Sequence, residues 1–407
     1  MEETVGALWS LFSFLLLFFA GSLVLLAALL KFLRSMSWWC SCSVCEAYVT
    51  GSWTAHFGNL CDWYAHLLRE SPTRTIQIHV LGNTVTANPD NVEHMLRARF
   101  DNYPKGKPFS VILRDLLGHG IFNVDGDLWR FQRKIASAEL GSAAVRLFAS
   151  CIVADEIRGR LLPLLDFACA GDKILDLQDV FRRFAFDNIC KISFGLDPRC
   201  LELSLPLSEF AAAFDKASRL SARRATTTTP IVWKAKRLLN WGSERELREA
   251  IGMVNLLAME IIRQRRKLGS CSNHDLLSRF MASVDDDNYL RDIIISFLLA
   301  GRDTIASALT ELWGNDCHDF RPHRWLTNGV FTPESPYKYP VFQGGLRGCL
   351  GKEMALLDMK TVIAAVVRRF DIDVVGDNSS RTPKFAPGLT ASLEGGLPVR
   401  VRRREES

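Results

Sequence analysis

The sequence has few of the features that mark several large classes of protein. Its 407 residues contain no internal repeat, so the chain is not an array of repeated units. The net charge is only +5, with Lys and Arg spread along the chain. No module combining aromatic and basic residues occurs, which argues against nucleic acid as a partner. The charge instead predicts a solvated surface with a mild preference for acidic partners or anionic lipid.

The sequence also contains only one long apolar run. Residues 5–30 contain no charged side chain, and about 20 apolar residues suffice to cross a bilayer. The run is too long for the apolar core of a cleavable signal peptide, and a single span does not favour a transporter. Acidic Glu2 and Glu3 precede the run, and basic Lys31 and Arg34 follow it. The positive-inside rule therefore predicts a membrane anchor over residues 1–34, with the rest of the chain in the cytosol.

The 11 cysteines do not form the even framework of a small secreted domain, and they fit a reducing compartment. Cys40, Cys42 and Cys45 follow the apolar run as C-x-C-x-x-C. A metal site is one interpretation, but no second cysteine or histidine pair stands at a zinc-like distance. Palmitoylation of juxtamembrane cysteines is another. We expect these three residues to be free thiols near the membrane.

Residues 35–407 predict one mixed, helix-rich domain. Residues 75–82 alternate toward a glycine and predict a strand, with 84–87 as its hairpin mate. A helix is expected to begin after Asn88-Pro89 and to include residues 91–96. Further helices are predicted over residues 128–138, 143–162, 177–192 and 244–268. Loops are predicted at 226–230 and 283–288.

The most informative stretch is residues 342–351, which precede a helical run starting at Lys352. It reads F-x-x-G-x-R-x-C-x-G, with fixed positions at Phe342, Gly345, Arg347, Cys349 and Gly351. The glycines allow a tight turn that can approach a flat macrocycle. Cys349 stands just ahead of a helix N-terminus, where the helix dipole favours a thiolate. The pattern predicts that Cys349 ligates a haem iron and that Arg347 pairs with a haem propionate. A buried cysteine in a glycine-rich turn is the alternative, and five matching positions in ten residues disfavour it.

These residues resemble the haem-binding loop of the cytochrome P450 monooxygenases. The resemblance implies the cytochrome P450 fold, which is mainly α with a small β region, here preceded by one N-terminal transmembrane helix. A thiolate ligand donates electron density that favours O–O cleavage, so oxygenase chemistry is expected rather than oxygen carriage. The implied cofactor is haem (heme b, with its iron). The implied partners are dioxygen, a lipid-like small-molecule substrate, the membrane, and a reductase that passes on electrons from NADPH.

Two further motifs support the resemblance. Trp129 and Arg133 stand four residues apart on a predicted helix and so share one face. In the family such a W-x-x-x-R pair binds a haem propionate, and the alternative is a packed Trp beside a solvated Arg. Residues 300–304 read A-G-x-D-T inside an apolar helix, where a carboxylate beside a hydroxyl is costly without a partner. The resemblance implies that Asp303 and Thr304 relay protons, and the alternative is that Thr304 bonds back to its own helix.

The family pattern is interrupted after this helix. In the family, several helices and the strands lining the substrate pocket follow, before an F-x-P-x-R-W segment that residues 320–325 match. Here only residues 305–319 stand between Thr304 and that segment. The resemblance therefore implies that an internal segment is missing between Thr310 and Glu311, which leaves the fold incomplete.

The missing segment would carry an E-x-x-R pair that forms a buried ion network with Arg324. The one E-x-x-R in this chain is at residues 260–263, ahead of the A-G-x-D-T helix, and does not replace it. Removing partners from a buried ion network costs several kcal/mol. We therefore expect impaired activity.

Segments outside the haem motifs indicate a branch of the family. Residues 62–68, 102–109, 120–126 and 338–343 are similar to plant fatty-acid omega-hydroxylases, nearest the branch that oxidises jasmonoyl-isoleucine. The resemblance implies hydroxylation of the terminal carbon of a fatty-acid-like or jasmonoyl-amino-acid substrate, and residues 108–122 would cover that substrate. It also implies a single-pass protein of the endoplasmic reticulum membrane. The alternative is a non-catalytic remnant, or a mis-built gene product, that binds haem poorly.

Overall fold

The computed structural model describes residues 16, 18–27, 40–202, 209–226, 230–268, 275–302, 304, 321–375, 385–386, 388–390 and 392–404. These residues divide into two compact units. The first comprises residues 1–58 and 62–87, and the second comprises residues 59–61 and 88–407. The domain boundary predicted at residue 34 lies outside the described residues.

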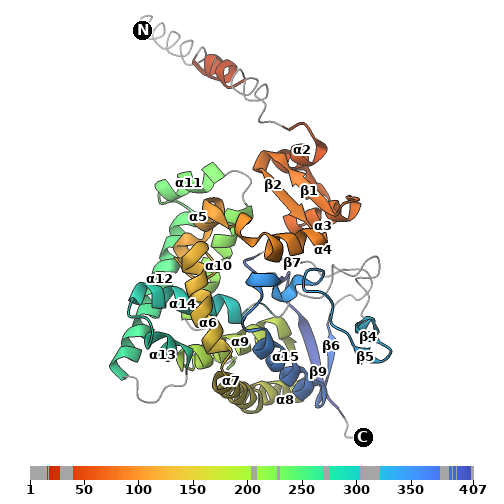
Figure 1. Ribbon diagram of the computed structural model, residues 1–407, viewed down its shortest axis with the longest axis vertical. Coiled ribbons are helices and arrows are strands. Elements are labelled where there is room, and N and C mark those ends of the chain that lie inside the picture. The colour runs from red at the N-terminus through yellow and green to blue at the C-terminus, as the bar shows by residue number, and fades with distance from the viewer. Residues whose placement is uncertain are drawn as a thin grey trace, which may run out of the picture. The chain divides into compact units, whose positions relative to one another are not determined.

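The first unit is small and combines short helices with a β-hairpin (Figure 1). Its elements are an apolar helix at Phe18–Ala27, α2 (Ser43–Thr50), η1 (Ser52–Ala55), most of α3 (Leu60–Glu70), β1 (Thr75–Ile78), η2 (His79–Leu81) and β2 (Asn83–Thr86). β1 and β2 are antiparallel, and Thr75 pairs with Thr86, which confirms the predicted hairpin. The ring of Trp63 stacks on those of Tyr48 and Trp53, at 6.5 and 5.7 Å between centroids. Of these rings, those of Tyr48 and Trp63 are buried and form the unit's small core together with Cys45 and Ile78.

The second unit is mainly helical. Its helices and single turns are α4 (Pro89–Glu93), η3 (His94–Ala98), η4 (Phe100–Asn102), α5 (Gly106–Leu117), α6 (Gly126–Leu140), α7 (Ala143–Glu156), η5 (Ile157–Leu161), α8 (Leu162–Ala170), α9 (Leu177–Phe194), α10 (Glu209–Thr226), α11 (Pro230–Leu238), α12 (Ser243–Leu268), α13 (Leu276–Met281), α14 (Asp287–Arg302), η7 (Pro322–Trp325), η8 (Pro340–Phe342), η9 (Gly345–Arg347) and α15 (Lys352–Val367). Its strands are β3 (Ile174–Asp176), β4 (Leu326–Thr327), β5 (Val330–Phe331), β6 (Phe370–Val374), β7 (Phe385–Ala386), β8 (Ser392–Leu393) and β9 (Pro398–Arg403).

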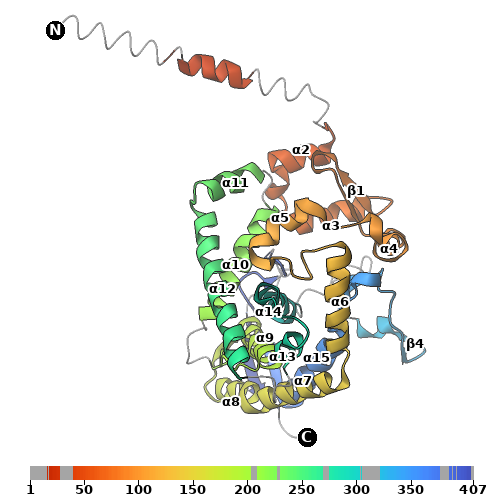
Figure 2. The ribbon, with the colours of Figure 1, turned by 60° about the vertical axis from the view of Figure 1, so that its left-hand side comes forward.

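The helix α14 lies at the centre of the larger core. Leu290, Ile294 and Leu298 are fully buried, and their spacing of four residues places them on one face. That face packs against α9 and α12. Figure 2 shows α14 nearly end-on, with α12 and α6 on opposite sides of it. The A-G-x-D-T motif therefore stands at the end of the most central helix of this unit.

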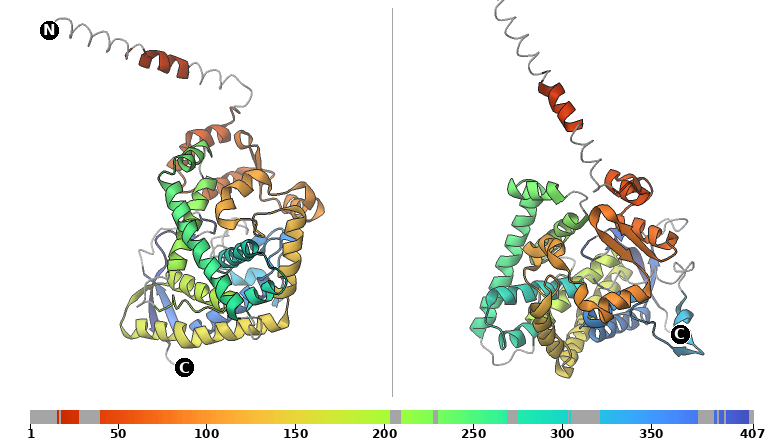
Figure 3. Two further views of the ribbon diagram at one scale, coloured as in Figure 1. Left: turned by 90° about the vertical axis from the view of Figure 1, so that its left-hand side faces the viewer. Right: turned by 45° about the horizontal axis from the view of Figure 1, so that its top comes forward.

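A second core lies between the helices α7 to α9 and a three-stranded sheet. The strand order is β3-β9-β6, and both pairings are antiparallel. Val399 and Val401 alternate along β9 and are buried at 0% and 2% exposure, as a strand with one buried face requires. The run α7, η5 and α8 is continuous from residue 143 to residue 170 and crosses the lower part of the left view in Figure 3.

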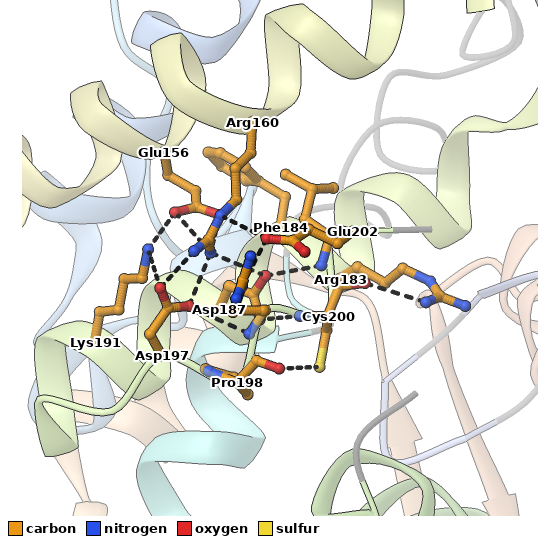
Figure 4. A network of polar contacts seen from close by, with 12 residues as sticks. Glu156, Arg160, Arg183, Phe184, Asp187, Lys191, Asp197, Pro198, Cys200 and Glu202 are labelled. Carbon is orange, nitrogen blue, oxygen red and sulfur yellow. Dashed lines mark hydrogen bonds and ion pairs between the residues drawn. The ribbon is translucent and has the colours of Figure 1, made fainter. Parts of the chain in front are cut away.

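A cluster of charged side chains ties α7, η5 and α9 to the loop that follows α9 (Figure 4). Arg160 contacts Glu156 at 3.1 Å and Asp197 at 2.5 Å, and lies 3.9 Å from the fully buried Asp187. Lys191 pairs with Glu156 and, at 3.3 Å, with Asp197. Burial alone would raise the pKa of Asp197, but Arg160 and Lys191 hold it at about 2.

Asp187 closes the same cluster from α9 because it accepts N–H bonds from the loop. The backbone N–H groups of Cys200 and Leu201 each donate to its carboxylate at 2.8 Å. This buried carboxylate is therefore hydrogen-bonded, as a stable fold requires.

No single helix in the described ranges is both long and apolar enough to cross a bilayer. The helices Gly126–Leu140 and Ala143–Ala170 reach the necessary length and composition only as a pair bent by 65°. Of the predicted anchor, Leu16 and the short apolar helix Phe18–Ala27 are described, and the remainder lies outside the described residues.

Candidate functional site

Cys349 lies in a loop that leads into the N-terminus of α15. Its backbone N–H donates to the carbonyl of Phe342 at 2.7 Å, which closes the loop on itself. The side chain of Cys349 is exposed, although cysteine is among the most often buried residue types. The next residue, Leu350, packs against the core that contains α14. The predicted position of Cys349 just ahead of a helix is confirmed.

Gly345 is required by the backbone at this point. Its φ is +54°, and a Cβ atom there would lie 2.1 Å from the carbonyl oxygen of Leu96. No side chain fits in that space. The loop can therefore approach η3 this closely only with glycine at position 345. Gly351, by contrast, has open space where a Cβ would project.

The predicted pair on α6 reaches this loop. Trp129 is buried at 6% exposure, and the guanidinium of Arg133 lies 5.7 Å from the centroid of its ring. Arg133 also donates a hydrogen bond to the carbonyl of Gly348. Burial lowers the pKa of Arg133, the Cys349 sulfur opposes that shift, and the charge of Arg347 adds to it. The structure thus brings Trp129 and Arg133 to the residues beside Cys349.

Arg347 is held by a protein carboxylate that the sequence analysis did not identify. Its guanidinium contacts Asp125 at 3.0 Å and lies over the rings of Phe100 and Trp129, at 5.0 and 5.2 Å from their centroids. Asp125 is the residue just before α6, and that position was the only signal that could have indicated it.

The pKa of Asp125 is lowered as a result of its surroundings. Burial alone would raise it, but the backbone N–H groups of Gly106 and Lys105 and the charge of Arg347 lower it. The N–H of Gly106 donates to Asp125 at 2.9 Å. Asp125 therefore stays ionised and fixes both Arg347 and the start of α5.

Lys105 is a third cation near the loop, and the sequence analysis missed it. Its ammonium donates to the carbonyl of Phe122. Burial lowers its pKa to about 8, the charge of Arg347 acts in the same direction, and Asp125 opposes both. Arg133 and Arg347 therefore place two positive charges near Cys349, and Lys105 lies close enough to Arg347 to interact with it electrostatically.

An open cavity lies between α5 and the start of α6. Its volume is about 330 Å³, and its lining includes Ser110, Arg114, His119, Asp125 and Leu128. The segment expected to cover the substrate, residues 108–122, contributes much of this lining. α5 runs from Gly106 to Leu117 and is the helical part of that segment.

The expected proton-relay pair is described only in part. Thr304 is exposed, and its hydroxyl donates to the carbonyl of Ala300 at 3.0 Å. This is the back-bonded geometry that the sequence analysis named as the alternative. Asp303, residues 305–320 and the side chain of Arg324 lie outside the described residues. At Gly301, a Cβ atom would lie 2.6 Å from the side chain of Ile189, so glycine there lets α14 approach α9 closely.

The described residues around Cys349 fit a haem group. The sulfur atom of Cys349 is exposed just ahead of the N-terminus of α15, where negative charge is favoured. The guanidinium of Arg133 donates to the carbonyl of Gly348, and that of Arg347 belongs to the same loop, two residues before Cys349. Two guanidinium groups suit the two carboxylates that a haem carries. The ring of Phe342, which lies 5.9 Å from the ammonium of Lys352, belongs to the same loop.

Comparison with known proteins gives matches over most of the chain. The family model described as Cytochrome P450 matches residues 59–312 and, as a second segment, residues 310–394. Cytochrome P450 94C1 of Arabidopsis thaliana is 47% identical over 473 positions, which cover 92% of this chain and 95% of that protein. Cytochrome P450 94B3 of the same plant is 40% identical, with 85% and 88% covered. Cytochrome P450 94A1 of Vicia sativa is 34% identical, with 84% and 87% covered.

Solved structures show the same fold. The crystal structure of the cytochrome P450DA heme domain superposes with a TM-score of 0.61 over 84% of this chain and 92% of that chain. The sequence identity is 18%, so this likeness concerns the fold alone.

Proposed function

The chain belongs to the cytochrome P450 family, and we propose from this that it is a haem-thiolate monooxygenase which hydroxylates the terminal carbon of a fatty-acid-like or jasmonoyl-amino-acid substrate. The observation that carries the proposal is the loop at residues 342–351, where an exposed cysteine sulfur stands beside Arg133 and Arg347. A haem with a thiolate ligand supplies dioxygen activation and insertion of oxygen into a C–H bond.

Each residue of the loop has a distinct task in this proposal. Cys349 supplies the sulfur ligand, and Arg133 and Arg347 bind the carboxylates of the group. Asp125 orients Arg347 through their 3.0 Å contact. Gly345 allows the loop backbone to approach the backbone of Leu96 closely, and this contact fixes the position of the loop. Phe342 and Gly351 complete the loop at its two ends.

The proton relay is assigned to Asp303 and Thr304. Thr304 presents its hydroxyl at the end of α14 and currently donates to Ala300. A rotation about its χ1 angle would redirect that proton toward a reacting oxygen, which is the role of a positioned general acid.

The substrate class rests on likeness to a branch of the family. Three relatives from the 94 group match over 84% or more of this chain. The open cavity beside α5 is lined by His119 and Arg114 as well as by Leu128. A lining of this kind suits a substrate that combines a carboxylate with an apolar body. Electrons are supplied by NADPH through a reductase.

We place the protein in the endoplasmic reticulum membrane as a single-pass protein with its bulk in the cytosol. The uncharged run at residues 5–30 and the basic residues after it support this topology. Protease added to intact microsomes should therefore digest the chain beyond about Arg34. Protection of the C-terminal part would contradict the topology.

A second candidate is a non-catalytic remnant, and a specific observation favours considering it. The two matched segments of the family model meet at residues 310–312. The alignment with the 94C1 relative is 473 positions long, which exceeds the 407 residues of the chain and so requires gaps in it. The length of the alignment supports missing residues, and the family-model segments support a place near Thr310 and Glu311, with weakened haem binding as the expected consequence.

The reduced carbonyl difference spectrum of the expressed chain tests the proposal, because it reports a thiolate-ligated haem directly. A thiolate-type spectrum that is lost in Cys349→Ala and kept in Cys151→Ser, an exposed cysteine on α7, supports the assigned ligand. A thiolate spectrum that persists in Cys349→Ala would overturn it. A chain that shows no spectrum favours the remnant.

A further inference from the structure

Three cysteines and one histidine of the first unit converge on one point. The ligand atoms of Cys40, Cys42, Cys45 and His79 all lie within 4.8 Å of one another. The sulfur of Cys40 is 3.3 Å from Nδ1 of His79, and those of Cys42 and Cys45 are each 3.9 Å from it. The C-x-C-x-x-C motif alone predicted free thiols, because no second cysteine or histidine pair stands at a zinc-like distance in the sequence.

Two separate elements deliver these four residues. Cys40 and Cys42 precede α2, Cys42 is its N-cap, and Cys45 lies in its first turn. His79 comes directly after β1, in the single turn η2 that leads to Gly82 at φ +63°. Figure 1 shows the start of α2 next to the β1–β2 hairpin. The histidine therefore reaches the cysteines across more than 30 residues of sequence.

The spacing of the ligand atoms suits a tetrahedral metal ion. Metal–sulfur bonds of about 2.3 Å and metal–nitrogen bonds of about 2.0 Å give sulfur–nitrogen edges of about 3.5 Å in a tetrahedron. The three distances at His79 lie on either side of that value. Three thiolates and one imidazole are a ligand set that zinc occupies in closed structural sites.

The second ring nitrogen of His79 has its own partner. Nε2 lies 3.1 Å from the side-chain oxygen of Gln77, to which it donates. The proton is then on Nε2, and the lone pair of Nδ1 faces the three sulfurs. A hydrogen bond of this kind on the outer nitrogen is what orients histidine ligands in metal sites.

The small core of the first unit gives a reason for a metal ion to contribute to the stability of that unit. Its core consists of little more than Cys45, Tyr48, Trp63 and Ile78, and a structural metal is one way in which a unit with a small core gains stability. The cysteines are free thiols. In a reducing compartment, three clustered thiols beside a histidine favour metal binding over disulfide formation.

We propose that Cys40, Cys42, Cys45 and His79 bind one Zn²⁺ ion in a closed structural site, separate from the haem loop. The ion joins the start of α2 to the β1–β2 hairpin and so fixes the chain just after the apolar N-terminal run. Three deprotonated thiols and one neutral imidazole give the bound ion a net charge of −1.

Metal analysis of the full-length chain, purified in detergent with reductant and without chelator, tests the site. We expect about one zinc per chain, and less than about 0.1 in Cys42→Ser and in His79→Ala. His79→Cys supplies a fourth thiolate and should retain the zinc. Gln77→Ala should keep the ion but weaken its affinity about 10-fold.

Cys151→Ser is the matched control, because Cys151 is an exposed cysteine outside the cluster, and it should bind as much zinc as the wild type. Cobalt offers a second measurement, since Co²⁺ in the wild-type chain should show the absorption of a tetrahedral thiolate complex that Cys42→Ser lacks. Should the ligand variants fail to fold, the zinc and cobalt results on the wild type still decide the matter. The proposal is overturned by a wild-type chain without zinc, by an iron–sulfur absorption in its place, or by equal zinc in the wild type and in the variants Cys42→Ser and His79→Ala.

Discussion

At the scale of single residues, Gly345 imposes the strictest geometric condition on the loop at residues 342–351. Alanine there would combine a positive φ with a Cβ atom 2.1 Å from a backbone oxygen. We expect Gly345→Ala to destabilise the second unit by at least about 2 kcal/mol. Thermal unfolding followed by circular dichroism measures the effect. Gly252→Ala, on α12 with open space at its Cβ, is the control and should be neutral or stabilising. Equal melting temperatures for the two variants would contradict this account.

Asp358 provides a pH-dependent prediction. It lies on α15, and burial raises its pKa from the ordinary value of 3.8 to about 6. The folded state therefore favours the protonated carboxyl. The stability it contributes is fully present below about pH 4 and is lost as the pH rises through 6.

The variant Asp358→Asn should remove this pH dependence and be more stable than the wild type at pH 7.5, by about 1 kcal/mol because the side chain is partly exposed. Urea unfolding at pH 5 and pH 7.5 measures both effects. A wild-type pH profile in the variant would show that another group is responsible.

At the scale of elements, the charged cluster around Arg160 joins η5, α9 and the loop after α9. Arg160→Ala would remove a guanidinium that lies 3.1 Å from Glu156 and 3.9 Å from Asp187, two carboxylates at 2% and 0% exposure. We expect a loss of about 3 kcal/mol in the free energy of unfolding. Arg158→Ala, two residues away, removes an exposed pair with Asp155 and an exposed hydrogen bond to the carbonyl of Ala154, and it should cost less than about 0.5 kcal/mol. Chemical denaturation of both variants makes the comparison, and similar losses would refute the role given to the cluster.

The sequence predicted those elements whose signals are local. The helices expected at residues 128–138, 177–192 and 244–268 correspond to α6, α9 and α12, because apolar spacing along one helix face is readable without knowing the partner. The break expected at 283–288 lies between α13 and α14, although its last two residues already belong to α14. The helix expected at 143–162 is present, but it passes through a π-helical turn at η5, which no local pattern indicated.

Long-range pairings were not predictable in the same way. Cys349, Arg347, Trp129 and Arg133 carry motif spacings, whereas Asp125 and Lys105 do not. The contact of Asp125 with Arg347 and the electrostatic influence of Arg347 on Lys105 emerged only from the fold. His79 was likewise read as a strand residue because its cysteine partners lie 34 or more positions away. A side chain that reaches a site from another helix or strand has no sequence spacing that would identify it.

At the scale of the whole molecule, the proposed gap between Thr310 and Glu311 leads to a prediction about competence. Insertion of the corresponding segment from a full-length relative at this junction should restore the reduced carbonyl spectrum and the hydroxylation of fatty acids or jasmonoyl-isoleucine, because it would supply the partners of Arg324 and the pocket wall that the family resemblance implies. The unmodified chain should show weak haem incorporation and little turnover. A full spectrum and turnover from the unmodified 407 residues would show that the segment is dispensable.

The three-stranded sheet has a consequence for the order in which the molecule can form. β9 is the last strand of the chain, yet it is the middle strand of the sheet, with Val399 paired to Leu175 of β3 on one side and to Val374 of β6 on the other. A ribosome has completed β3 more than 200 residues before it reaches β9, so β3 must wait for most of synthesis without a partner. A transcript that stops before residue 398 loses more than a terminal strand, because it leaves two earlier strands with nothing between them.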